Sequence, residues 1–134
     1  MAKRKIQAEN TKKRGEVFTP PLLAEEMISN LPFDDVKIDD TILDPCVGAT
    51  FVFPIFYMFK WVSKFGVENI SHFITKCLYV SDINEVALEY GQYVLHTYIE
   101  MLIESGVELT RQHYIDNFQN IIDGYYDYCE CNEI

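Results

Sequence analysis

Two short apolar segments that each end in an aspartate constrain the fold of this chain more than any other feature. TILDP ends its apolar run at Asp44, and KCLYVSD ends at Asp82. Each segment is too short for a buried helix and predicts a buried strand. Long apolar stretches at residues 50–66 and 84–106 predict helices between and after these strands. Pro54 is expected in the first turn of the first helix and Gly66 at its end, with Asn84 as a candidate cap and Gly106 as the stop of the second. Such alternation favours an α/β fold with a parallel sheet.

Three further elements complete the predicted order. Thr19 precedes two prolines, which predicts a helix with Thr19 as its N-cap and the prolines in its first turn. Residues 110–118 predict a short helix, and QNIIDG at residues 119–124 predicts a third strand. We therefore expect a partial Rossmann-like fold of about three parallel strands flanked by helices, without the later strands of the complete fold.

The charge of the chain divides it into an arm and a body. Six of the eleven basic residues lie in positions 1–14, while the remainder carries five basic and twenty acidic residues. We predict a disordered basic arm at residues 1–14 and one domain at residues 15–134. Because an acidic body repels phosphate, contact with DNA is expected only through the arm or through a partner.

Several classes of protein and site lack their signals in this sequence. No apolar run is long enough to span a membrane, and no apolar segment follows the basic start, so we predict a cytoplasmic protein of a bacterium or phage-infected cell. The four cysteines form no CxxC pair, which favours reduced thiols and predicts no metal site. Neither a GxGxxG fingerprint nor a Walker GK[ST] motif occurs.

The residues at the two predicted strand ends favour a nucleoside cofactor that carries a positive charge. Ligands of open parallel sheets bind beyond the carboxyl ends of the strands, where Asp44 and Asp82 are expected. Asp82 can accept hydrogen bonds from ribose hydroxyls, Ile83 can cover an adenine ring, and Gly48 permits close backbone approach. This combination suggests S-adenosylmethionine. The alternative is that each aspartate only caps the helix that follows it.

Three segments, in their order and spacing, resemble the opening motifs of N6-adenine DNA methyltransferases. These segments are GEVFTPPLLAEEMISNLP, TILDPCVGATFVFPIF and LYVSDIN, and the resemblance extends over residues 14–124. The similarity is to the enzymes of restriction–modification systems and phages in which the cofactor motifs precede the catalytic motif. The most specific part is GEVFTP followed about 25 residues later by LDP-x-x-G.

The resemblance implies a set of cofactor contacts. The matching positions are Phe18, Thr19, Pro20, Asp44, Pro45, Gly48, Asp82 and Ile83. By analogy with the family, the first three would line the methionine end of S-adenosylmethionine, and the next three would form the loop beneath it. Asp82 would hold the ribose and Ile83 would pack on the adenine.

The chain departs from the family at two positions of the cofactor site. Thr50 stands where the family usually has a second glycine, which is expected to narrow the room near the cofactor. After the third strand the family usually has a glycine followed by an acid that contacts the adenine amino group. Tyr125 occupies that acidic place here, and Asp123 or Asp127 is the candidate substitute.

The catalytic tetrapeptide [ND]PP[YFW] of the family is absent from the sequence. In the family its polar side chain and a carbonyl hold the adenine amine while its aromatic ring stacks on the flipped base. We therefore predict no catalytic residues and expect a truncated S-adenosylmethionine-binding domain that is inactive alone or part of a split enzyme.

A second hypothesis is a non-enzymatic interaction protein with a methyltransferase-like fold. It would bind a restriction–modification enzyme or another partner. Both hypotheses leave a strand edge that the tail of the chain, a second copy of the chain or a second polypeptide would cover.

Overall fold

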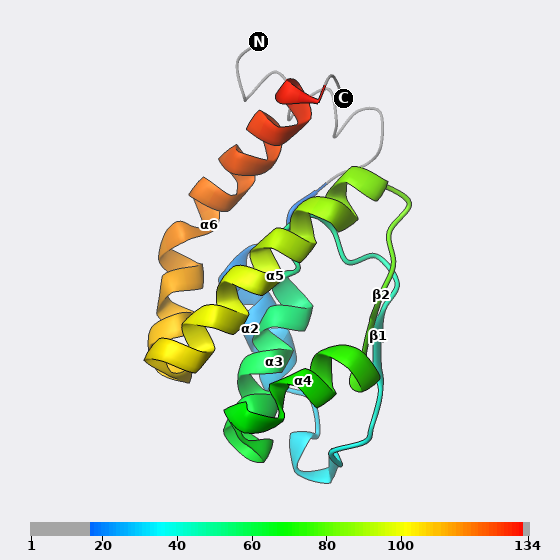
Figure 1. Cartoon of the computed structure of the whole chain (residues 1–134), viewed down its shortest axis with the longest axis vertical. Helices are drawn as coiled ribbons and strands as arrows, with labels where there is room; N and C mark the ends of the chain where they lie inside the picture. The colour runs from blue at the N-terminus through cyan, green and yellow to red at the C-terminus, as the bar shows by residue number, and fades with distance from the viewer. Residues whose placement is uncertain (1–16, 133–134) are drawn as a thin grey trace.

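The computed structural model describes residues 17–132, and helices dominate this part of the chain (Figure 1). The predicted basic arm, residues 1–14, lies outside the described residues. The α-helices are α2 (Pro21–Ser29), α3 (Val52–Phe65), α4 (Ile70–His72), α5 (Glu85–Ser105) and α6 (Val107–Cys131). The strands are β1 (Ile42–Asp44) and β2 (Leu78–Val80). Short 3-10 helices span Phe33–Asp35 and Val67–Asn69, and a π-helix spans Phe73–Cys77. No helix within residues 17–132 combines the length and the apolar character needed to cross a membrane.

The predicted partial Rossmann-like fold with a sheet of about three strands is wrong, because residues 17–132 are mostly helical and contain only two strands. Residues 119–124, the expected third strand, lie inside α6. The buried residues of α6 follow the period of a helix and not of a strand: apart from the adjacent pair Tyr125 and Tyr126, successive buried residues are three, four or eight positions apart. These buried residues are Thr110, Tyr114, Ile122, Tyr125, Tyr126 and Cys129. The predicted short helix at residues 110–118 is the first half of the same helix.

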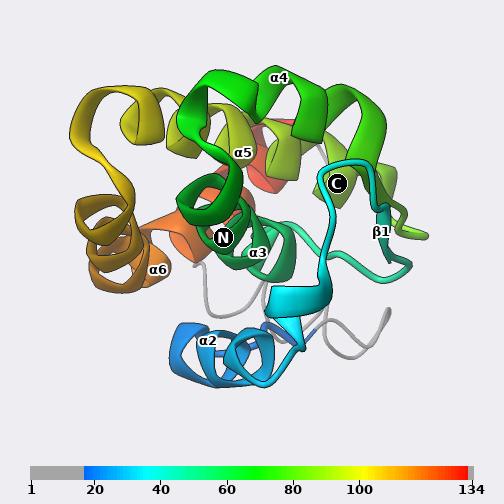
Figure 2. The same ribbon diagram turned by 90° about the horizontal axis from the view of Figure 1, so that it is seen from below.

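The two strands themselves confirm the prediction of short parallel strands at these positions. In the parallel register, Leu43 of β1 lies opposite Tyr79 of β2. Ile42, Leu78 and Val80 are half-buried against the main core, whereas the other face of the pair is open. On that open face Leu43 is 64% exposed and Tyr79 is 53% exposed. The strand pair forms one side of the molecule in both views (Figures 1 and 2).

Helix α3 is the centre of the core. Nine of its fourteen residues are buried, and Met58 and Trp61 are fully enclosed. A helix that is apolar nearly all round requires neighbours on every side. Figure 2 shows α3 surrounded by α2, α4, α5 and α6. The predictions that Pro54 lies in its first turn and that Gly66 ends it are confirmed.

The ends of the other long helices test the capping predictions. Asn84 caps α5 as predicted, since its side-chain oxygen accepts hydrogen bonds from the N–H groups of Val86 and Ala87. Gly106 ends α5 as predicted. The prediction that Thr19 caps α2 is wrong, because Pro20 is the N-cap residue and no side chain caps the helix. Prolines at both Pro20 and Pro21 fix the backbone there, so a capping hydroxyl is not required.

The loop between β1 and α3 is fixed by a left-handed residue. Phe51 has φ 51° and ψ 35°, an arrangement that costs a non-glycine residue about 1–2 kcal/mol. Its ring is buried against the backbone of Gly91 in the middle of α5. A Cβ atom on Gly91 would lie 2.1 Å from the ring, so only glycine fits there.

Candidate cofactor site

Hydrogen bonds join the two loops that follow β1 and β2 at the carboxyl ends of the strands. The Val47 N–H donates to the Ser81 carbonyl at 3.1 Å, and the Ser81 N–H donates to the Asp44 carbonyl at 3.0 Å. The Ser81 hydroxyl donates to the Pro45 carbonyl at 3.0 Å. These bonds hold the loops side by side without any ligand, which is the location expected for a ligand site in a parallel sheet.

Asp82 adds two further bonds to this framework. One carboxylate oxygen accepts from the Gly48 N–H at 2.9 Å, and the other accepts from the Asn84 N–H at 2.8 Å. Asp82 is half-buried. An ionised carboxylate has about four lone-pair positions, so Asp82 keeps acceptor capacity for a ligand while it links the two loops.

A cavity of about 400 Å³ opens over these loops, within the size range of small-molecule sites. Its lining residues are Val17, Phe18, Pro45, Cys46, Gly48, Ala49, Asp82, Ile83, Asn84 and Ala87. Five of the nine predicted cofactor contacts are among them, namely Phe18, Pro45, Gly48, Asp82 and Ile83. The structure therefore brings together residues from three separate segments of the sequence.

The other four predicted contacts lie outside the cavity lining. Thr19 and Pro20 come immediately after Phe18, at the start of α2, and Asp44 immediately precedes Pro45. Asp123 lies on α6, where its carboxylate accepts a hydrogen bond from the Gln119 side chain at 3.1 Å. The choice of Asp123 depended on a third strand, and a helix in its place leaves Asp123 outside this cavity.

Gly48 shapes the floor of the cavity. Its φ of +72° is in the left-handed region, which glycine adopts without the penalty of a side chain. A Cβ atom placed on Gly48 would meet no atom within 4 Å. The space above its backbone is thus open for an incoming group.

Asp44 lies beside the cavity with one oxygen unsatisfied. Its Oδ1 accepts from the Cys46 N–H at 3.2 Å, whereas its Oδ2 is buried and has no hydrogen-bond partner within residues 17–132. Burial raises the pKa of this carboxyl, the Cys46 bond partly offsets the rise, and the negative charge of Asp82 adds to it. A buried acceptor without a partner favours a donor from outside the protein.

An aromatic layer from α6 supports the cavity from behind. The Asn84 side-chain amide donates to the Tyr125 hydroxyl at 2.8 Å, and both groups are buried. The ring of Phe18 meets those of Tyr125 and Tyr126 edge-on, with centroids 6.1 and 5.8 Å apart. Tyr125, which stands where the family has an acid, therefore positions two lining residues and does not itself line the cavity.

Thr50, the other departure from the family, also lies outside the cavity lining. It is 2% exposed, and its carbonyl accepts from the buried Tyr114 hydroxyl at 3.1 Å. The residue that lines the cavity at this point is Ala49. The narrowing that we expected from Thr50 is therefore not present in this conformation.

Sequence reasoning missed five lining residues: Val17, Cys46, Ala49, Asn84 and Ala87. Asn84 had been assigned only as a helix cap, and Ala87 follows one turn later on the same face of α5. The sequence does contain a signal for this side of the cavity. The small residue Ala87 follows the helix cap Asn84 by one turn, and Asn84 itself follows the acidic residue after the strand.

The charges of the lining residues determine which class of ligand the cavity favours. Within residues 17–132, Asp82 is the only ionisable side chain apart from Cys46 in the lining, and no basic residue of this part of the chain lines the cavity. Such a cavity favours a neutral or cationic ligand over a phosphate. No group of three or more His, Cys, Asp or Glu side chains in residues 17–132 could hold a metal ion, and the four cysteines are free thiols.

Comparisons with known proteins identify no relatives. No family model matches the chain, and neither a curated protein nor a solved structure matches it significantly. The function must therefore be argued from the residues of the cavity and from the sequence motifs that form it.

Proposed function

We propose that the cavity at the ends of β1 and β2 binds S-adenosylmethionine. The observation that carries this proposal is the meeting of Phe18, Gly48, Asp82 and Ile83 around one cavity of ligand size. These residues come from the three segments that resemble the cofactor motifs of N6-adenine DNA methyltransferases. S-adenosylmethionine is a nucleoside joined to methionine through a sulfonium. A site for it requires a carboxylate, an open glycine backbone and apolar side chains, and this cavity has all three.

Electrostatics favour this cofactor over a nucleotide. S-adenosylmethionine carries a sulfonium cation and no phosphate. Asp82 lines the cavity, and Asp44 lies beside it with a buried oxygen that has no partner within residues 17–132. Among residues 17–132, an anionic phosphate would meet two carboxylates and no basic side chain in the lining, whereas a cation is attracted by both carboxylates.

Two lining residues have distinct proposed roles. Asp82 accepts the ribose hydroxyls through the lone pairs that the Gly48 and Asn84 bonds leave open. Ile83 is 96% exposed, which is unusual for isoleucine, and it covers one face of the adenine ring. Burying this side chain under an adenine removes apolar surface from water and so adds to affinity.

The proposal is cofactor binding, without methyl transfer by this chain alone. The sequence contains no [ND]PP[YFW] tetrapeptide to hold and stack a flipped adenine. Methylation of DNA would require a second polypeptide that supplies this motif, and DNA would be contacted through that partner or through the basic residues 1–14. Such an assembly would act in the cytoplasm of a bacterial or phage-infected cell, where both cofactor and DNA occur.

Calorimetric titration with S-adenosylmethionine tests this proposal. We expect saturable binding to the wild type, with a loss of about tenfold in affinity for Ile83→Ala, since covering one apolar side chain contributes about 1.5–3 kcal/mol. Because Ile83 is almost fully exposed, its truncation leaves the fold intact. Ile103→Ala, at an exposed position near the far end of α5, is the matched control and keeps the wild-type affinity.

Asp82→Ala should abolish binding in the same titration, and its folding must be checked because Asp82 also holds two backbone N–H groups. Absence of heat with the wild type at millimolar cofactor would overturn the proposal. Equal affinities of the wild type and Ile83→Ala would contradict the assigned position of the adenine.

The second candidate function is that of an interaction protein, and the open face of the strand pair favours it. Parallel sheets are normally covered on both faces, yet Leu43 and Tyr79 are more than half exposed. A second polypeptide or a second copy of the chain would cover this face. The hydrogen bonds of Asp82 also agree with a purely structural aspartate. The cofactor titration separates the two functions, because an interaction protein gives no binding heat.

A further inference from the structure

A second cavity, of about 360 Å³, lies between α2, α3 and α6, and it shares no lining residue with the cofactor cavity. Figure 2 shows the arrangement of these three helices, with α2 below α3 and α6 beside α3. Its apolar lining residues are Ile28, Phe33, Phe56, Phe59 and Val107. Its charged and hydroxyl lining residues are Glu25, Ser29, Asp34, Lys60, Ser63, Lys64, Glu108 and Arg111.

Basic residues are concentrated around this cavity. The acidic body has only five of them after residue 14, and Lys60, Lys64 and Arg111 all line this one cavity. The other two, Lys37 and Lys76, are not in its lining. In a chain with a net charge of −10, such a concentration requires a structural or a functional reason.

Two of the three cations have structural partners. The Lys64 ammonium donates to the carbonyls of Phe33, Asp34 and Val36 at 3.0, 2.9 and 2.6 Å, so all three of its donors are used. The Arg111 guanidinium pairs with Glu25 at 3.1 Å and lies 3.7 Å from Glu108. Both side chains therefore tie helices and turns together.

Lys60 differs from these two cations. Its ammonium makes one long hydrogen bond, 3.4 Å to the Ile28 carbonyl, and no carboxylate within residues 17–132 forms an ion pair with it. Lys60 is half-buried and lines the cavity. Partly buried charges are normally paired, and acidic residues are abundant in this chain, so the missing carboxylate is informative.

We propose that this cavity binds a small hydrophobic monocarboxylate whose charge pairs with Lys60. The apolar body of the ligand lies against Phe33 and Val107, the half-buried apolar residues of the lining. A single charge suits the site, because Glu25 and Glu108 lie near and a multiply charged anion would be repelled. A volume of about 360 Å³ admits a ligand with one aromatic ring and a short chain.

The competing explanation is that Lys60 only stabilises the last turn of α2. Ile28 belongs to that turn, and a cation there interacts favourably with the exposed carbonyls of the helix end. This explanation predicts a loss of stability when the charge is removed and no ligand. The two explanations differ in a binding measurement, so the test needs both stability and affinity.

The test is a titration of the whole chain with 4-phenylbutyrate, followed by amide chemical shifts, with neutral 4-phenylbutyramide as the matched ligand. We expect saturable shifts of residues in α2, α3 and α6 with the carboxylate and at least about tenfold weaker binding of the amide. Lys60→Met, which keeps the length of the side chain, should weaken carboxylate binding by a similar factor. Lys76→Met, at an exposed position outside the cavity, should leave it unchanged.

Three results would overturn the proposal: no saturable shifts with the wild type at millimolar carboxylate, equal affinity for carboxylate and amide, or unchanged binding by Lys60→Met. Thermal unfolding of each variant without ligand shows whether it folds. If Lys60→Met unfolds, Lys60→Gln provides a polar replacement that removes only the charge. The outcome is independent of S-adenosylmethionine, since the two cavities have no residue in common.

Discussion

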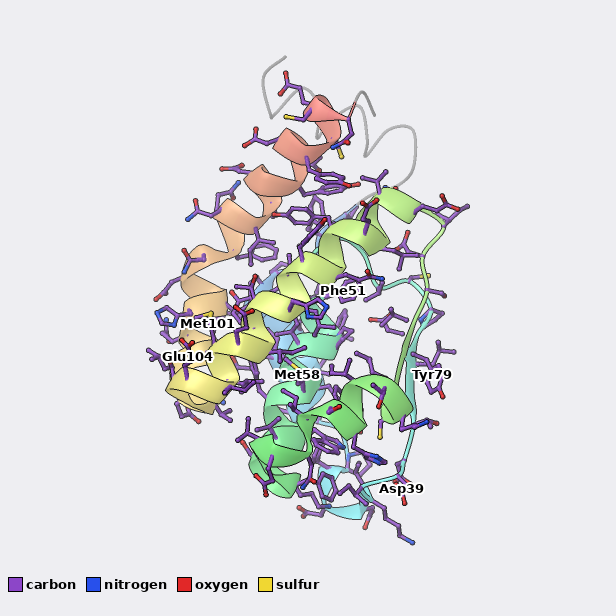
Figure 3. All side chains as sticks on the ribbon, viewed as in Figure 1. Asp39, Phe51, Met58, Tyr79, Met101 and Glu104 are labelled. Carbon is purple, nitrogen blue, oxygen red and sulfur yellow. The ribbon has the colours of Figure 1, made fainter. Side chains whose placement is uncertain are left out.

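The ring of Phe51 lies directly on the backbone of Gly91, so the loop that leads from β1 into α3 is fixed against the middle of α5. Phe51 is marked beside α5 in Figure 3. The left-handed conformation of Phe51 is retained because its ring is 1% exposed and enclosed by the core. The position of the cofactor loop thus depends on a glycine that lies 40 residues further along the sequence.

Gly91→Ala should lower the free energy of unfolding by about 1–3 kcal/mol, although alanine is the better helix former. The added Cβ would lie 2.1 Å from the Phe51 ring, so the ring or the helix must move. Urea denaturation measures the loss. The double variant Phe51→Leu with Gly91→Ala should show less than the sum of the two single losses, and simple additivity would contradict the contact.

Asp44→Asn should stabilise the ligand-free protein at neutral pH. Because burial and Asp82 raise the pKa of Asp44, the folded state binds its proton more readily than the unfolded state does. Stability contributed by this carboxyl therefore falls as pH rises from the ordinary aspartate range through the raised pKa. In thermal unfolding from pH 4 to pH 8, the melting temperature of the variant relative to that of the wild type should increase as the pH rises.

The control for this pH series is Glu104→Gln, at an exposed position on α5 (Figure 3). It should follow the wild type across the range. If Asp44 contacts the proposed cofactor, Asp44→Asn should weaken cofactor binding and at the same time stabilise the fold. Such a trade-off between binding and stability is typical of functional residues. A variant that loses stability at pH 8 would contradict the raised pKa.

Tyr125→Phe should lower stability by about 1–3 kcal/mol, because the buried hydrogen bond from the Asn84 amide to the Tyr125 hydroxyl is lost. The ring remains, so the contacts with Phe18 are kept. Chemical denaturation measures the loss, and Tyr93→Phe, at an exposed position, is the control. Equal stability of the two variants would show that the hydroxyl of Tyr125 is not required.

The open face of the strand pair predicts association that depends on salt. Sedimentation equilibrium of the wild type should show more association at high salt, where the repulsion between chains of net charge −10 is screened. The double variant Leu43→Thr with Tyr79→Thr should remain monomeric. Its stability should change by no more than about 0.5 kcal/mol, since both side chains are mostly exposed. Identical sedimentation of both proteins would argue against a second copy on this face.

Local signals were sufficient for the elements around the cofactor cavity. The strand end at Asp44 and the cap at Asn84 were predicted correctly, because each depends on a few neighbouring residues. The second strand was predicted at the right place, but it ends at Val80, two residues before Asp82. Residues 119–124 were predicted wrongly for the opposite reason. Two isoleucines before a glycine favour a strand locally, but the helical spacing from Tyr114 to Cys129 decides the outcome over a much longer span.

The walls of the cavity could not be predicted from local signals. Ala87 and Phe18 line it because α5 and the segment before α2 are brought together by packing, and no sequence pattern gives that distance. The same limit applies to Tyr125. It stands where the family has an acid, and tertiary packing places its hydroxyl on the side-chain amide of Asn84, behind the cavity lining.

The bond from the Gly48 N–H to Asp82 links positions 34 residues apart, so the cofactor cavity exists only while the two strands are paired. A molecule that occupies this cavity must therefore bind the folded chain and not the unfolded one. Ligand binding therefore stabilises the folded state. A ligand at a hundred times its dissociation constant adds about 2.7 kcal/mol to the free energy of unfolding. The melting temperature of the chain is accordingly expected to rise with the ratio of free ligand concentration to dissociation constant.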